Sequence, residues 1–539
     1  MARTRSPSVA VTAGAAALLA LAGTHALAQV VPEISPGSSG RLTGIRDISI
    51  PSGGESGTAV EAGVRTTLDV GDNLGRRPSG QEEAGARLTV SPYVRASAAN
   101  SRFQGSLNYR LRARYSSVDT VNANGLRHAL SARGNGLLLG DWLGVQGWAN
   151  TFYTSTSPFG LLDEDPEDSR VNSTRISTVS LAPYLQGRLG SFADYRAQYT
   201  VTRTDTSGAT RNLLARNNQQ LRGTLSSGPQ FARWGWALSA AGSQREFQNG
   251  REFSSSAFTG TLYYVFSPEL RVGVSASHLY IEQLTDTSGN NRGWGQGVNL
   301  DWAPNRRTSL RLNLSEQYYG TSANLSFAHR ASRWTFGFNY NRDVYSSNNA
   351  GILSMNLGTL LSADAYAPVL NPVFQELVDQ GVISPDEIVI GAGLLNDALV
   401  RRQTARATVG YLLPRGALSL SLFRNVRATL LDSTLFLPAS DPLVSTAFGR
   451  FETRGASLSL GLPLDSATTL SLIGSIRDVE SLDRPDSARL TTMTARVSTK
   501  LDAKTTVAAG VRRTVQSGTQ GSLSGYDNNM VFGTVDLRF

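Results

Sequence analysis

Three arginines spaced two residues apart, Arg110, Arg112 and Arg114, are the feature of the chain most suggestive of chemistry. A spacing of two places side chains on the same face of a β-strand, so the three guanidinium groups form a ladder. A planar guanidinium binds a carboxylate or a phosphate through paired hydrogen bonds, and a row of them attracts anions. The ladder therefore predicts a surface that guides small anions or anionic polymers.

The same strand parity places more arginines on the face that carries the ladder, which we interpret as the inside of a barrel. Acids on that face are fewer, with Asp194 and Asp536 among them. Two other interpretations stay open, because these arginines could pair with loop acids or contact lipopolysaccharide phosphates. The expected basic lumen consists of Arg110, Arg112, Arg114, Arg196, Arg271, Arg311, Arg406, Arg496 and Arg512, with Arg477 and Arg538 in matching positions.

Catalytic or metal chemistry has no comparable set of residues. Beyond residue 28 the histidines are His128, His278 and His329, and parity puts the last two on the apolar face. No nucleophile, base and orienting group can be selected, and cysteine is absent. The acidic stretch 163–168 lacks the spacing of an EF-hand and is expected to be a solvated loop. We expect no enzyme, no cofactor and no metal site.

The N-terminal residues predict export. Arg3 and Arg5 precede an apolar stretch, and Ala26-Leu27-Ala28 fits a cleavage site, so residues 1–28 are expected to be a signal peptide. Residues 29–58, rich in Pro, Gly and Ser, predict a flexible periplasmic lead-in. The net charge is +9, but no basic cluster with interleaved aromatics follows, so nucleic acid is not an expected partner.

The elements that must position the arginines are long strands of alternating apolar and polar residues. In 102–116, Leu107, Tyr109 and Leu111 alternate with the arginine ladder. A soluble β-sandwich is the alternative, but its strands average about 5–6 residues, and the strands expected here are much longer. The expected strands are 60–70, 84–96, 102–116, 125–139, 142–156, 172–188, 191–205, 214–228, 231–246, 252–266, 269–283, 291–303, 307–319, 320–330, 333–345, 398–413, 416–431, 446–463, 466–480, 487–502, 504–517 and 527–539.

The connections between these strands alternate in length. Those after even-numbered strands are tight, and those after odd-numbered strands are longer and polar, except at Tyr319-Gly320. Short periplasmic turns and longer external loops are typical of outer-membrane barrels. The sequence therefore predicts an all-β fold: a transmembrane antiparallel up-and-down β-barrel of about 22 strands over residues 59–539, with both termini periplasmic.

The final strand supports this fold. Val535, Leu537 and Phe539 lie on one face and end the chain on an aromatic residue, as in the C-terminal signature of outer-membrane barrels. We expect this strand to close the barrel against 60–70 and to be read by the barrel-insertion machinery. One external connection, 346–397, is unusually long and apolar, with helix signatures after Asn371 and Ser384. It is expected to be a lid or constriction, or else to pack on the outer rim.

Several stretches resemble a known family. These are Asp301–Pro304, Ser309–Leu312, Tyr319–Arg330, Ser332–Thr335, Asn341–Val344, Val64–Tyr115 and Ser419–Arg424. Together they are similar to PEP-CTERM system-associated outer-membrane β-barrel proteins. The resemblance implies a barrel of the Gram-negative cell outer membrane found with exosortase and exopolysaccharide loci. It implies no catalytic residues.

The sequence therefore leaves two alternative functions. The first is a porin or conduit associated with exopolysaccharide export, with anionic polysaccharide as a partner. The second is a structural or anchoring barrel that binds surface polymer or partner proteins without transport. In both, outer-membrane lipid and lipopolysaccharide surround the barrel. A plugged 22-stranded transporter is not expected, because 29–58 is too short for a plug domain.

Overall fold

A computed structural model describes residues 57–118, 125–155, 173–207, 216–247, 252–282, 291–346, 399–429, 450–518 and 525–539. The regular structure of these residues is β-strand throughout. No helix in them is long and apolar enough to cross a membrane. The expected signal peptide, the acidic stretch 163–168 and the helix signatures of 346–397 lie outside the described residues.

Twenty-two strands follow one another along the described chain. The first eleven are β1 (Gly57–Gly71), β2 (Gly85–Ala99), β3 (Phe103–Ser116), β4 (Gly125–Leu139), β5 (Leu143–Ser155), β6 (Ser173–Leu189), β7 (Ala193–Ser207), β8 (Arg216–Ser227), β9 (Trp234–Phe247), β10 (Glu252–Ser267) and β11 (Leu270–Ile281). The others are β12 (Arg292–Asn305), β13 (Thr308–Gln317), β14 (Gly320–Arg330), β15 (Trp334–Ser346), β16 (Leu399–Leu412), β17 (Ala417–Thr429), β18 (Phe451–Pro463), β19 (Thr468–Ser481), β20 (Ser487–Lys500), β21 (Thr505–Gly518) and β22 (Tyr526–Arg538).

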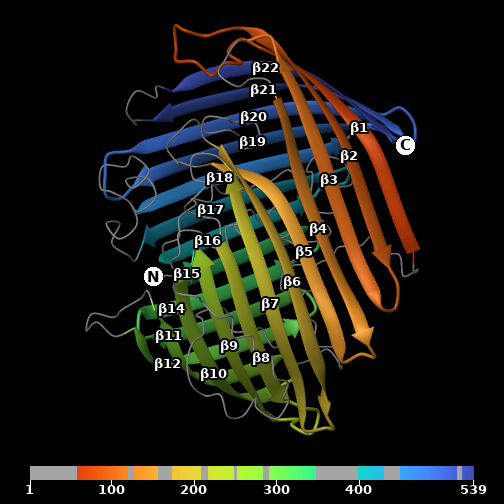
Figure 1. The fold of residues 1–539 in the computed structure, drawn as a ribbon. Helices are drawn as coiled ribbons and strands as arrows, with labels where there is room; N and C mark the ends of the chain where they lie inside the picture. Colours follow the sequence, from red (N-terminus) through yellow and green to blue (C-terminus); the bar gives the residue numbers. More distant parts are fainter. Residues whose placement is uncertain are drawn as a thin grey trace, which may run out of the picture.

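The strands form one closed sheet. Each strand pairs antiparallel with the next along the chain. β1 also pairs antiparallel with β22, which closes the ring. Figure 1 shows the colours passing around the barrel until red β1 lies beside blue β22. The predicted all-β class, antiparallel order and strand number are confirmed.

Side-chain contacts show which face of the sheet is concave. The Tyr184 hydroxyl of β6 donates to Asn135 Oδ1 of β4 at 3.0 Å, across β5. Gln198 of β7 likewise donates to Gln146 of β5 at 3.1 Å, across β6. Side chains reach over an intervening strand most readily where curvature brings them together. The polar positions of the alternation therefore face the inside of the barrel.

The opposite positions form an apolar outer band. They alternate with the polar ones because successive side chains of a strand point to opposite faces. An exposed band of this kind has to be covered by lipid, and a closed barrel can cross lipid because no strand edge is left unpaired. Members of the band that are exposed include Leu68, Val94, Leu107, Val179, Leu181, Leu221, Val274, Val298, Leu422, Leu458, Met493 and Val511.

Aromatic rings gather on the outer face near the strand ends that the tight turns join. Trp234 and Tyr264 lie 4.8 Å apart between ring centroids, and Trp334 and Tyr411 lie 4.4 Å apart. Trp and Tyr favour the boundary between lipid and water, because each combines an apolar ring with a polar group. These rings therefore mark one edge of the membrane-spanning band.

Tight turns follow the even-numbered strands. Asn100, Asp465 and Asp502 each accept two backbone N–H hydrogen bonds from residues two and three positions later. Gly190 turns with a φ of 58°, a left-handed conformation that glycine adopts without strain. One odd-numbered connection is also tight, between Gln317 and Gly320, as the sequence indicated.

Candidate functional site

The inner face of the barrel carries the arginines singled out in the sequence. Tyr93, whose hydroxyl donates inward to Asp536, stands opposite Arg110 in the register of β2 and β3. Arg112 and Arg114 follow at intervals of two and share that face. The register of the other strands gives the same placement for Arg196, Arg271, Arg311, Arg406, Arg477, Arg496, Arg512 and Arg538.

Eight inward arginines lie on a run of consecutive strands, β2 to β6. Their described residues include no aspartate or glutamate at all. We call the inward arginines of these strands the arginine wall. By register the wall consists of Arg87, Arg95, Arg110, Arg112, Arg114, Arg127, Arg133 and Arg188.

Two members of the wall face each other directly. Arg112 of β3 is the register partner of Arg127 of β4, and Arg127 is only 9 % exposed. Like charges directly opposite on one face of a sheet destabilise the pair. This pair therefore brings two positive charges to one point of the arginine wall.

Among the described residues, carboxylates of the two strands beside the wall bind arginines at its margins. Asp69 of β1 binds Arg87 at 2.8 Å, and Asp194 of β7 binds Arg188 at 2.8 Å. These pairs offset charge at the two margins of the wall. The described residues of β3 and β4 contain arginines and no acid, and those of β5 contain no charged residue.

Aromatic rings hold several inner arginines in place. The guanidinium carbon of Arg196 lies 4.3 Å from the centroid of the Tyr184 ring, and that of Arg271 lies 4.8 Å from Tyr263. A cation over a ring face is stabilised by about 0.5–2 kcal/mol. The rings thereby restrict where the charges point, which keeps them available along the inner face.

One inner carboxylate is shared by two of the predicted arginines. Asp301 of β12 accepts from Arg271 Nε at 2.9 Å and from Arg311 Nε at 3.1 Å. Two cations on one carboxylate leave a net positive cluster. This part of the barrel therefore repeats, on a smaller scale, the basic character of the arginine wall.

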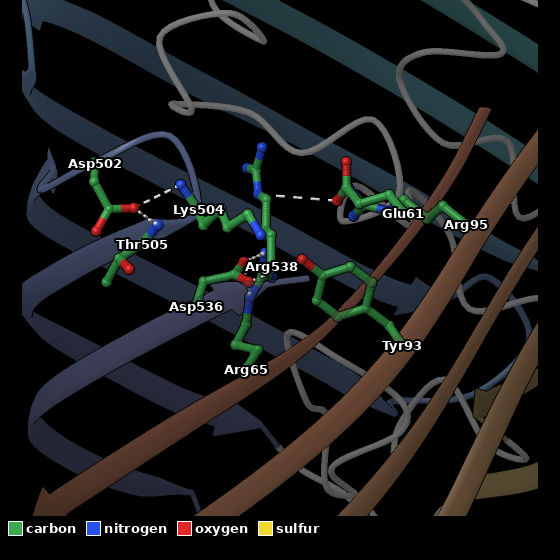
Figure 2. A network of polar contacts seen from close by, with 9 residues as sticks. All are labelled: Glu61, Arg65, Tyr93, Arg95, Asp502, Lys504, Thr505, Asp536 and Arg538. Atoms are coloured by element: carbon green, nitrogen blue, oxygen red, sulfur yellow. Dashed lines mark hydrogen bonds and ion pairs between the residues drawn. The ribbon is translucent and has the colours of Figure 1, made fainter.

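The strand that closes the barrel is fixed by a network on the inner face (Figure 2). Asp536 binds Arg65 at 2.7 Å and accepts from the Tyr93 hydroxyl at 2.9 Å. Nearer the rim, Glu61 lies 3.9 Å from Arg538, so two charged pairs hold the same end of the closing ladder, where Gly63 is opposite Arg538. The register between β1 and β22 is set by these pairs as well as by backbone hydrogen bonds.

The remaining sequence candidates lie on the outer face. Val535 and Leu537 are each 41 % exposed, and Phe539 is 72 % exposed at the end of the closing strand. His278 packs edge-on against exposed Trp294, with 5.1 Å between ring centroids, and His329 stacks near Phe336 at 6.3 Å. These placements put the two histidines away from the inner arginines.

Sequence reasoning missed several inner arginines, among them Arg127, Arg133, Arg222, Arg402 and Arg427. The apolar side of β4 is interrupted by His128, Gly134 and Gly136, which weakens the alternation that would have revealed Arg127 and Arg133. The apolar residues Leu126 and Leu130, two positions of the same alternation, could have indicated that Arg127 and Arg133 face inward. Among the described residues, no group of three or more His, Asp or Glu is placed to hold a metal ion.

The fold and its two faces define the class of the protein: a transmembrane β-barrel with a basic inner wall. No family model matches the chain. No curated protein matches it either. Neither comparison therefore supplies a family.

Solved structures of other barrels are similar to it at low identity. The siderophore receptor PirA from Pseudomonas aeruginosa is 10 % identical, covering 90 % of this chain and 81 % of that one, with a TM-score of 0.39. The FrpB iron transporter from Neisseria meningitidis is 9 % identical over 89 % and 82 %, with a TM-score of 0.47. The outer-membrane protein opdK from Pseudomonas aeruginosa is 8 % identical over 90 % and 99 %, with a TM-score of 0.31. No substrate or partner follows from similarities this weak.

Proposed function

We propose that this protein is an outer-membrane conduit of the porin kind whose inner face favours anionic solutes. The observation that carries the proposal is the arginine wall, on strands that contain no acidic residue in their described ranges. A low-dielectric barrel wall focuses the field of such charges toward the interior. The proposed role is transport.

The proposed location rests on the outer surface of the barrel. A closed sheet with an exposed apolar band and aromatic rings at one margin suits a bilayer in which every backbone group must be paired. The predicted signal peptide and the C-terminal Val535, Leu537 and Phe539 are consistent with export and with recognition by the insertion machinery. Both of these steps belong to the proposal.

We further propose anionic polysaccharide as the solute class. Successive rungs of the ladder Arg110, Arg112 and Arg114 are separated by about 6.7 Å along an extended strand. A row of bidentate cations at a fixed spacing suits a polymer that carries repeated carboxylates or phosphates. The resemblance to PEP-CTERM-associated barrels supports a link to exopolysaccharide export.

Ion selectivity in a planar bilayer tests the conduit. With a salt gradient, the wild-type protein should give a reversal potential that indicates preference for anions. The variant R110Q/R112Q/R114Q keeps a polar but shorter side chain at each position and removes three charges, and its reversal potential should move toward zero or to the cation side. The matched control R203Q alters an arginine paired with Asp205 in the exposed part of β7, and should leave selectivity unchanged.

Two results would count against the conduit. Equal selectivity in wild type and the triple variant would remove the arginine wall from the mechanism. Absence of conductance, both in the full chain and in a chain lacking 346–397, would favour the alternative of a structural or anchoring barrel. Binding of acidic polysaccharide to intact cells would then be the next measurement.

A further inference from the structure

The outer face of the barrel carries a row of arginines just beyond the apolar band. Arg424 of β17 pairs in register with Arg454 of β18, which pairs with Asp478 of β19, which pairs with Arg489 of β20. Since neighbouring strands are about 4.8 Å apart, the row is about 14 Å long. Each of the three arginine side chains is more than half exposed. We call these three residues the outer arginine row.

Carboxylates hold the row in position without covering it. Glu452 accepts from Arg424 Nε and Nη2, both at 2.8 Å. Asp478 lies between Arg454, at 3.6 Å, and Arg489, and is shared by both. A guanidinium has five N–H donors, so each arginine keeps donors that point away from its carboxylate. The row can therefore accept an additional anionic group.

A groove lies on the same outer face, and it begins four residues along β18 and β20 from Arg454 and Arg489, at Leu458 and Met493. It encloses about 550 Å³ and is lined by apolar residues from β17 to β22, among them Leu458, Leu472, Met493 and Val511. At Gly474 a small residue interrupts the large ones, and a Cβ built there would meet no atom within 4 Å. We call this the outer groove. Arg513 also lines the groove, so its lining includes a cation as well as apolar residues.

A second depression on the outer face provides a contrast. It encloses about 830 Å³ across β9 to β14 and is likewise apolar, with Leu262 and Val298 in its lining. Its polar lining residues include Gln296 and Glu316, and no arginine or lysine lines it. An apolar groove without nearby charge can bind the acyl chain of any lipid. The outer groove differs because arginines lie on the same face, so it favours a lipid that also carries negative charge.

We propose that the outer groove and the outer arginine row together bind one anionic glycolipid of the outer leaflet. Its acyl chain would lie over Gly474, and its phosphate groups would bind Arg454 and Arg489. Arginine suits this contact because its fork matches two phosphate oxygens at once. The inference rests on the proposed outer-membrane location and is independent of whether the barrel conducts solutes.

Native mass spectrometry of the detergent-purified full chain tests the site. The probes are diphosphoryl lipid A and the same lipid without phosphates. The variant R454Q/R489Q should weaken binding of the phosphorylated lipid at least tenfold and leave the dephosphorylated lipid unaffected. G474L fills the groove and should weaken binding of both lipids.

Matched controls separate the site from general effects. Gly223 of β8 is also a strand glycine whose added Cβ meets no atom within 4 Å, so G223L should leave binding unchanged. R203Q removes another exposed arginine and should also have no effect. Heat-modifiable gel migration confirms that each variant is folded before binding is measured.

The proposal is overturned if the phosphates make no difference to wild-type binding, or if G223L weakens binding as much as G474L. These outcomes are distinct from failure of the conduit, which is read from conductance. They are also distinct from failure of the outer-membrane location, which is read from cell fractionation.

Discussion

An aromatic ring lying over a glycine is a repeated unit of the inner wall. Tyr184 covers Gly144 of the neighbouring strand, and Tyr263 covers Gly235 in the same way. The missing Cβ lets each ring lie flat against the sheet, where an arginine can stack on it. The ring occupies less of the interior in this position than it would if it pointed toward the barrel axis.

Substitution of such a glycine should destabilise the barrel. A Cβ at Gly144 would lie 2.3 Å from Tyr184 Cζ, so G144A forces the ring to move and should cost about 1–3 kcal/mol. G223A adds the same methyl group where no atom lies within 4 Å, and should be neutral or slightly stabilising. Urea unfolding in lipid vesicles compares the two. Equal stabilities would contradict the close packing of ring and glycine.

Parity in the sequence identified many of the inner arginines on strands with clear apolar alternation, as around Arg110 and Arg112. It failed for Arg127, whose strand has His128 and glycines at the outward positions. The stacking of Tyr184 on Gly144 could not be predicted, because it depends on the register between two strands. That register is set by turns and by cross-strand packing, which a single strand does not encode.

At the scale of elements, the tight turns depend on ionised carboxylates. The pKa of Asp465 is lowered chiefly by the backbone N–H of Ala467 and then by that of Thr468. The pKa of Asp502 is lowered first by the backbone N–H of Lys504 and then by Thr505. Both turns join an even-numbered strand to the next, at the same end of the barrel.

The pH dependence of these turns follows from the sign of the shift. A carboxylate whose folded pKa lies below the unfolded value of about 3.9 stabilises the fold fully above that value. The contribution disappears as the pH falls through the folded pKa. D465A/D502A should therefore unfold faster than wild type at pH 6, and the difference should shrink below about pH 4.

Unfolding rates in urea across pH 2–7 measure this effect. D465N/D502N is the matched control, because asparagine keeps an acceptor oxygen but does not titrate. Its rates should show no transition from these two positions in the acid range. A difference between wild type and the alanine variant that persists unchanged at pH 2 would contradict the assignment.

All 22 strands were predictable, most with ends within a few residues of those observed, because long alternating segments separated by turn residues give a strong signal. The first strand begins at Gly57, earlier than the expected Val60, because Gly57, Thr58 and Ala59 continue the ladder with β2. The small residues at that end show no alternation of apolar and polar side chains. The sequence pattern therefore gave no reason to begin the predicted strand before Val60.

At the scale of the whole molecule, one buried carboxylate supports the closure of the barrel. Asp536 is 5 % exposed and binds both Arg65 and Tyr93. D536N removes the charge that Arg65 faces and should destabilise the folded barrel by about 1–3 kcal/mol, toward the lower value because Arg65 is partly exposed. D205N, at the exposed pair Arg203–Asp205, should change stability by about 0–1 kcal/mol.

Gel migration without boiling measures this prediction. A folded barrel migrates differently from the boiled chain, and the temperature at which the folded band disappears should be lower for D536N than for wild type and D205N. Identical migration of boiled and unboiled wild type would count against a stable barrel altogether. Loss of the folded band at one temperature in all three proteins would remove Asp536 from the closure.

The pairing of β1 with β22 also affects the order of events during biogenesis of the barrel. Arg65 and Asp536 are separated by 471 positions, so the earliest strand to leave the ribosome must wait for the last one before the ring can form. Throughout that interval β1 has an open edge, and open edges invite pairing with other chains. The charges of Glu61, Arg65 and Asp69 discourage such pairing during the delay. A stalled or truncated chain would retain this edge, and would be a target for aggregation or for periplasmic proteases.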